Sequence, residues 1–343
     1  MIAILPWHES ALTTLIQRGD KLPHALLIHG KSGIGKVEFA MALAQSLLCE
    51  SPTASGIACG ECNACGWFQQ SNHPDFRMLL PEAMADEEGA DDAAEPEAKA
   101  EAKDKKKSKE IKIDQIRAIG DFMTLSTHRN GFRVLLIQPA EALNPAAANA
   151  LLKTLEEPAA RTLILMVTDK LGRLLATIRS RCQRVLVPSP DIAMATTWLT
   201  SQNIENADDA LAEANGGPLD AVAYADRDYQ ALQRAFVAAL SEPKMDYVEA
   251  AQHFEKADLT TLITWLQTYV NDIISERMVG GVSHHPRQVK AIKRIAAHID
   301  LARVFRFESE LRKTRRLINH PLNARLLLEQ LLIGYRQAIK STQ

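Results

Sequence analysis

Three residues, Gly30, Gly35 and Lys36, have the spacing of a phosphate-binding loop. They occur in the string G-K-S-G-I-G-K, which follows the apolar stretch L-L-I-H and precedes a helix-like stretch that ends near Leu48. Glycines let backbone N–H groups surround phosphate oxygens, the start of the helix adds a positive dipole end, and a lysine can reach the outer phosphates. The pattern predicts a nucleotide-binding loop with the candidate residues Gly30, Gly33, Gly35 and Lys36.

The residues that would hold Mg²⁺ beside this loop are missing. A working loop has Ser or Thr after the lysine, and this chain has Val37. The apolar stretch 131–138 reads as a buried strand, after which an ATPase of this class has Asp and usually Glu. Gln138 and Pro139 stand there instead, and the nearest carboxylate is Glu141. Both defects affect the same metal ion, so we predict that this loop does not hydrolyse ATP.

Four cysteines follow the first helix and form a second candidate site, at Cys49, Cys59, Cys62 and Cys65. Two-residue gaps let successive thiolates turn onto one ion, and four thiolates suit closed, tetrahedral, structural zinc. Reduced core cysteines are the alternative, but Gly60 and Asn63 are turn formers. A redox pair would leave two cysteines unexplained. His73 could be a further ligand, although with four thiolates present we favour a loop-capping role.

Composition limits the classes of function. The chain has 343 residues with 40 basic and 42 acidic side chains, so its charge demands no polyanionic partner. No run is apolar and long enough to span a membrane, and residues 1–7 lack signal-peptide features. We therefore expect a soluble cytoplasmic protein of two or three domains with no membrane partner.

Alternating strand-like and helix-like stretches predict an α/β domain up to about residue 189, where Pro188-Ser189-Pro190 marks a boundary. Continuous apolar character suits parallel strands that are buried on both faces. Beyond the first strand we expect further strands at 76–80, 131–138, 162–168 and 185–187, and helices at 36–48, 114–125, 144–158 and 174–178.

The segment 82–110 has a different composition. It is rich in alanine, acidic at first, and then basic from Lys103 to Lys109. Such a segment lacks the apolar side chains that could offset the entropy of ordering, so we expect a disordered, solvated insertion. DNA contact by its basic end is the alternative.

Four features together resemble the clamp-loader branch of the AAA+ proteins and, within it, the delta-prime family of bacterial DNA polymerase III subunits. They are the cysteine module after the first helix, H-P-D at residues 73–75, A-N-A-L-L-K-T-L-E-E-P at residues 148–158, and R-S-R-C at residues 179–182. The resemblance covers the chain apart from the 82–110 insertion. The missing Mg²⁺ ligands point to delta-prime rather than to the ATP-hydrolysing subunits.

The resemblance implies a fold of class α/β plus all-α. An AAA+ (RecA-like) P-loop domain would span residues 1–189, with a zinc module at 49–65. A small helical lid would span 190–230, and a helical collar for oligomerisation would span 231–343. Apolar stripes in the last region fit helices: Leu262, Trp265, Leu266, Tyr269, Ile273 and Ile274, and then Leu326, Leu327, Leu331 and Leu332. For the basic cluster Arg312, Lys313, Arg315 and Arg316 we favour a solvated helix face over a DNA contact.

By resemblance, Arg181 matches an arginine finger that reaches the ATP site of a neighbouring subunit. Spacing alone would make it one more exposed arginine at a strand edge. Thr168 matches the first sensor residue, Lys36 the lysine of the phosphate loop, and the four cysteines the zinc ligands. Binding of ATP or ADP stays open. The implied partners are delta and gamma/tau subunits in a pentameric ring and, through that ring, the sliding clamp and primed DNA.

Three hypotheses follow. The first is a stator-like clamp-loader subunit without ATPase or polymerase catalysis of its own, within a DNA-directed DNA polymerase (nucleotidyltransferase) holoenzyme. The second is an ATP-hydrolysing motor subunit, against which Val37, Gln138 and Pro139 argue. The third is a zinc-containing nucleic-acid-binding module, against which the near-neutral charge and the few aromatics near the cysteines argue.

Overall fold

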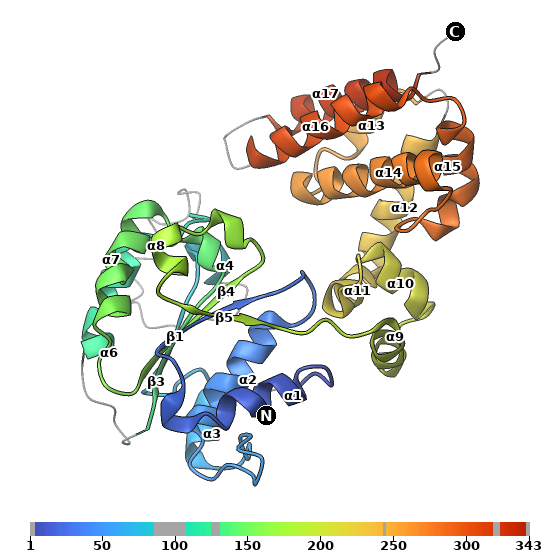
Figure 1. Cartoon of the computed structure of the whole chain (residues 1–343). Helices are drawn as coiled ribbons and strands as arrows, with labels where there is room; N and C mark the ends of the chain where they lie inside the picture. Colours follow the sequence, from blue (N-terminus) through green and yellow to red (C-terminus); the bar gives the residue numbers. More distant parts are fainter. Residues whose placement is uncertain (1–3, 86–107, 125–130, 243–244, 318–322, 341–343) are drawn as a thin grey trace, which may run out of the picture. The chain divides into compact units, whose positions relative to one another are not determined.

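A computed structural model of the chain describes residues 4–85, 108–124, 131–242, 245–317 and 323–340 (Figure 1). The chain divides into two compact units, Met1–Met194 and Ala195–Gln343, which we describe separately. The three-domain division expected from the sequence stays a prediction.

The first unit is built on a five-stranded sheet in the order β2-β3-β4-β1-β5, in which all neighbouring strands are parallel. β1 and β4 are paired so that His29 lies opposite Thr168. β3 and β4 are buried along their whole length, as their continuous apolar sequences predict. The strands are β1 (Ala25–His29), β2 (Phe76–Leu79), β3 (Arg133–Ile137), β4 (Thr162–Thr168) and β5 (Gln183–Leu186).

Helices cover both faces of this sheet (Figure 1). On one face, α1 (Glu9–Ile16) and α2 (Lys36–Leu48) share a hydrophobic cluster with Leu26 and Ile28 of β1. On the other face, α5 (Ile113–Ala118), α7 (Pro145–Glu156) and α8 (Ala176–Arg179) share a cluster with Ala25 and Leu27. Because side chains alternate along a strand, β1 packs against the helices on both faces of the sheet, and this packing fixes the position of the loop that follows β1.

Local differences from the expected elements have simple causes. The helix expected at 114–125 is interrupted at Ile119, giving α5 and α6 (Gly120–Thr124), because Gly120 disfavours helix. The short helix expected at 174–178 is present as α8, which begins two residues later, and a 3₁₀ turn η5 (Leu171–Arg173) precedes it. The expectation for 82–110 falls mostly on residues 86–107, which lie outside the described residues. Its ends form α4 (Glu82–Ala85) and a hydrogen bond from Ser108 N to Glu82 Oε2 of 3.2 Å.

All the regular elements that the structure describes in the second unit are helices. A smaller cluster joins α9, α10 and α11, and a larger one joins α12 to α17. Both expected stripes lie in the larger core except for Leu326, which is exposed because it lies on the face of α17 opposite the buried Leu328, Leu331 and Tyr335. The helices are α9 (Ile192–Ser201), α10 (Ala207–Glu213), α11 (Pro218–Tyr224), α12 (Arg227–Ser241), α13 (Tyr247–His253), α14 (Leu259–Val279), η6 (Pro286–Gln288), α15 (Val289–Ala296), α16 (Leu301–Leu317) and α17 (Ala324–Ile339).

Two surface properties of the chain also follow from the helices. In the described ranges, no helix combines the length and apolar character needed to cross a membrane. In the basic cluster of α16, Arg312 pairs with Glu308, and Arg315 Nη1 donates to Gln267 Oε1 at 2.8 Å. The preference for a solvated helix face over a DNA contact stays a prediction.

Candidate functional site

The predicted phosphate loop lies between β1 and α2. Gly35 is the N-cap of α2 with φ +85°, and Gly33 has φ +68°, backbone conformations that glycine adopts without strain. At Gly30, an added Cβ would lie 2.7 Å from Cδ1 of Ile34. Gly33 and Gly35 therefore suit the backbone conformation of this turn, and Gly30 lies where a side chain would press on Ile34.

The interior of the loop is filled by the chain itself. The Ile34 side chain is fully buried, and its carbonyl oxygen accepts hydrogen bonds from Trp7 Nε1 and His8 Nε2, each at 2.8 Å. Burial lowers the pKa of His8 to about 4, so its imidazole is neutral at pH 7. The N-terminal segment thereby closes one side of the loop.

Lys36 is buried and engaged by groups of its own chain. Its Nζ lies 2.5 Å from Oδ1 of Asp169 and also donates to the carbonyl of Lys31. Asp169 follows Thr168, whose buried hydroxyl accepts from Lys170 N at 3.0 Å. The parallel pairing of β1 and β4 brings Lys36 and Thr168 to the same edge of the sheet. The ammonium group that would meet a phosphate is thus held by a carboxylate.

The Mg²⁺ side of the loop has no ligand set. Val37 is partly buried against the core, and Gln138 and Pro139 follow β3, as expected. Glu141, the nearest carboxylate in sequence, lies in the 3₁₀ turn η4 (Ala140–Ala142). Within the described ranges, the only group of three or more candidate metal-binding side chains is the set of four cysteines.

The four cysteine sulfurs converge, with all of them within 4.8 Å of one another. Cys49 Sγ lies 3.5 Å from Cys59 Sγ and 3.8 Å from Cys62 Sγ. Four sulfurs at about 2.3 Å from a tetrahedral zinc ion are about 3.8 Å apart, so the cluster has the size such an ion requires. Backbone N–H groups of Cys59, Cys62 and Cys65 each donate to the preceding cysteine sulfur at 3.3 to 3.4 Å.

Charge also favours a cation in this cluster. Burial raises the pKa of Cys62, but hydrogen bonds from Cys65 N and the neighbouring thiols outweigh it and bring that pKa to about 7. Burial and the neighbouring thiols raise the pKa of Cys65 to about 12. Adjacent thiolates repel one another, so the thiols cannot all ionise unless a cation compensates their charge. The arrangement could hold a divalent metal ion.

Arg181 lies just after α8, and its side chain is 34% exposed. Its Nε donates to Glu156 Oε1 at 2.8 Å, and its Nη2 lies 2.5 Å from the same oxygen. Its Nη1 donates to the carbonyl of Thr177 at 3.0 Å. In contrast, Cys182 beside it is buried, and burial raises its pKa to about 12, so it is an inert thiol.

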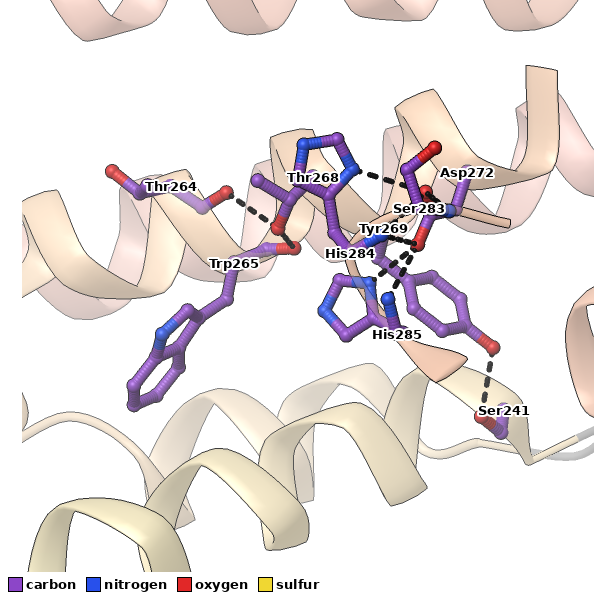
Figure 2. A network of polar contacts seen from close by, with 9 residues as sticks. All are labelled: Ser241, Thr264, Trp265, Thr268, Tyr269, Asp272, Ser283, His284 and His285. Atoms are coloured by element: carbon purple, nitrogen blue, oxygen red, sulfur yellow. Dashed lines mark hydrogen bonds and ion pairs between the residues drawn. The ribbon is translucent and has the colours of Figure 1, made fainter. Parts of the chain in front are cut away.

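Sequence reasoning missed a polar network around Asp272 in the second unit (Figure 2). The buried Asp272 carboxylate accepts from the backbone N–H groups of Ser283, His284 and His285 and from both imidazole Nδ1 atoms, at 2.8 to 3.1 Å. Burial raises the pKa of Asp272, but these hydrogen bonds outweigh it and hold the pKa well below its usual range. The network fastens the loop after α14 to that helix. Its sequence signal is a lone acid within an apolar stripe, followed by H-H-P.

Two family models match this chain. The model described as "DNA polymerase III, delta subunit" matches residues 8–191, and the model described as "DNA polymerase III, delta subunit, C terminal" matches residues 224–337. The first alone covers more than half of the chain. The chain belongs to the DNA polymerase III delta-subunit family.

Several curated relatives of this chain are delta-prime subunits, which confirms the resemblance inferred from the motifs. The "DNA polymerase III subunit delta'" of Pseudomonas aeruginosa is 36% identical over 225 residues, which are 64% of this chain and 61% of that protein. The protein of the same name from Haemophilus influenzae is 31% identical over 81% of this chain and 79% of its own length. That of Escherichia coli is 30% identical over 78% and 75%.

Among solved structures, a gamma subunit-related protein of DNA polymerase III from Thermotoga maritima was aligned with this chain. The alignment covers 97% of this chain and 100% of the Thermotoga maritima chain, at 18% identity and a TM-score of 0.44. The fold class expected from the sequence is confirmed by the parallel sheet, the helical second unit and the delta-subunit models. The assignments of the nucleotide-loop residues, the zinc ligands and Arg181 stay predictions.

Proposed function

We propose that this chain is a stator-like, non-hydrolysing subunit of a DNA polymerase III clamp loader. Such an assembly uses ATP to load a sliding clamp onto primed DNA during replication. Membership of the delta-subunit family and the delta-prime relatives support this role. The implied partners are delta and gamma/tau subunits in a pentameric ring in the cytoplasm, with clamp and DNA reached through that ring.

The observation that carries the proposal is the contrast between Arg181 and the chain's own loop. Arg181 is partly exposed at the end of α8, where a guanidinium could approach the γ-phosphate of a neighbour's ATP. Such a finger stabilises the charge that develops on the transferred phosphoryl group and contributes roughly 10³–10⁵ in rate. The loop after β1 has Val37 and Gln138 where Mg²⁺ ligands are needed.

Zinc and nucleotide have separate roles in this proposal. The cysteine cluster would hold one structural zinc ion through Cys49, Cys59, Cys62 and Cys65, which closes the turn between α2 and α3 (Asn63–Gln69). The loop around Lys36 would at most retain ATP or ADP, because the Asp169 carboxylate binds the Lys36 ammonium group, and Val37 and Gln138 stand where Mg²⁺ ligands are needed.

The experiment compares ATP turnover by the isolated chain with turnover by a reconstituted loader that contains Arg181→Ala. We expect background turnover from the isolated chain and a loss of at least tenfold in the clamp- and DNA-stimulated turnover of the loader. Arg173→Ala is the matched control, because Arg173 is a nearby exposed arginine. Substantial turnover by the isolated chain would instead support a motor subunit, and an unaffected loader would refute the finger.

A further inference from the structure

The guanidinium of Arg181 is held in one orientation by its own chain. Glu156 Oε1 accepts from Nε and Nη2, at 2.8 and 2.5 Å, and the Thr177 carbonyl accepts from Nη1 at 3.0 Å. All three guanidinium nitrogens therefore have a partner within the chain. Nη1 also donates to Ser180 Oγ at 3.4 Å. One of the five guanidinium N–H groups, on Nη2, is left over after these four contacts, and it can be offered to an incoming oxygen.

Both groups that hold Arg181 belong to well-anchored elements. Glu156 is the last residue of α7, a helix whose Leu151 and Leu155 are buried in the core. Thr177 lies in α8, whose Ile178 is buried in the same cluster as Leu155. The two helices are neighbours in the structure (Figure 1). The Arg181 contacts therefore rest on fixed supports.

We propose that Glu156 is a positioning residue for Arg181. This inference rests on the proposed function, because it concerns how the finger would be presented to a neighbour's phosphate. A free arginine side chain samples many rotamers and loses that freedom when it is ordered. A carboxylate that holds the Nε–Nη2 edge restricts these rotamers before the neighbour binds, so that less freedom is lost on binding.

The opposite effect would be that Glu156 slows the reaction, because its negative charge partly cancels the positive charge that Arg181 offers to a phosphate. The magnitudes favour positioning. The Glu156 side chain is 50% exposed, so water and salt screen the effect of its charge on a phosphate. A displacement of about 1 Å in a catalytic group can cost up to about 10²-fold in rate.

The test uses Glu156→Ala, Glu156→Gln and Arg181→Ala in the reconstituted loader, with ATP turnover measured as separate kcat and KM. We expect Glu156→Ala to lower kcat roughly fivefold with little change in KM. Glu156→Gln keeps an oxygen that can accept from Nε, so we expect it to retain most of the turnover. Glu157→Ala, at the adjacent exposed residue, should be neutral. Melting of each variant chain confirms that it folds.

The double variant separates positioning from a general effect. If Glu156 acts through Arg181, Glu156→Ala has no further effect on kcat in an Arg181→Ala background. Equal losses in both backgrounds would overturn the positioning role, as would an unchanged or faster kcat in Glu156→Ala alone. A loader that is indifferent to Arg181→Ala would overturn the proposed finger and the positioning role with it.

Discussion

The ammonium group of Lys36 lies 2.5 Å from Oδ1 of Asp169, the residue that follows β4. The pair joins the phosphate loop to the neighbouring strand of the sheet. A phosphate that enters the loop must compete with this carboxylate for the lysine, and it must also approach a negative charge. The loop therefore differs from a nucleotide site on two counts: it lacks Mg²⁺ ligands, and its cation is already neutralised.

Replacing Asp169 by Asn should strengthen nucleotide binding without creating an ATPase. Removal of the like charge frees Lys36 for the phosphates, and a partly exposed charge of this kind is worth about 1 kcal/mol, or roughly fivefold in Kd. Titration of the chain with a fluorescent ADP measures the change, and hydrolysis should stay at background. Lys36→Ala in the Asp169→Asn chain should abolish the gain. Equal or weaker binding in Asp169→Asn would show that Asp169 does not oppose nucleotide.

The sequence predicts the elements around this pair but not the pair itself. The limits of α2 at Lys36 and Leu48 and of β4 at Thr162 and Thr168 agree with expectation, because glycine turns and continuous apolar runs are local signals. The Lys36–Asp169 contact depends on the register of β1 with β4. That register is set by packing between distant segments, which local spacing does not encode.

The same reason explains the other features that the sequence did not reveal. The motif indicates Arg181, yet its partner Glu156 lies 25 positions earlier in the chain. Asp272 was hidden within an apolar stripe, because a helical pattern does not show which loop will fold back onto it. The cysteine cluster is the opposite case. Its C-x-x-C steps are short enough to constrain Cys59, Cys62 and Cys65 directly, whereas Cys49 is brought to them by the fold of the turn after α2.

Replacing Cys62 by Ser should remove the metal and destabilise the first unit. A structural zinc site contributes its binding free energy to folding, so loss of one of four thiolates weakens both. Metal analysis of the purified chain should fall from about one equivalent of zinc to well below one, with a lower melting temperature. Cys182→Ala is the control, because that buried thiol lies outside the cluster and its loss should leave the zinc content unchanged. A wild-type chain that contains no zinc, with the same melting temperature as Cys62→Ser, would contradict the zinc site.

Asp272→Asn should destabilise the second unit by about 2–4 kcal/mol. The amide has one acceptor oxygen instead of two, and its NH₂ group would face donors from His284 and His285. Urea denaturation followed by tryptophan fluorescence measures the loss, since Trp265 is buried in this core. Asp228→Asn, at an exposed acid in the first turn of α12, should change stability by less than about 0.5 kcal/mol. Similar stabilities for the two variants would refute a structural role for the network.

His8 should make the stability of the first unit depend on pH. Burial lowers the pKa of His8 from 6.5 to about 4. Between these two pH values His8 is therefore protonated in the unfolded chain and neutral in the folded chain. Stability linked to His8 is therefore complete above pH 6.5 and is lost as the pH falls from 6.5 toward 4. Between about pH 7.5 and pH 5 the expected loss is about 2 kcal/mol.

His8→Gln isolates this effect, because glutamine can still donate to the Ile34 carbonyl but does not titrate. Urea unfolding of both chains at about pH 7.5 and pH 5 gives the pH-dependent loss for each, and zinc loss and other titrating groups are common to the two. We expect the loss on acidification to be smaller in His8→Gln by about 2 kcal/mol. If the two chains lose the same stability, His8 is not excluded from protonation in the folded state, and the closed contact between the N-terminal segment and the phosphate loop must open in acid.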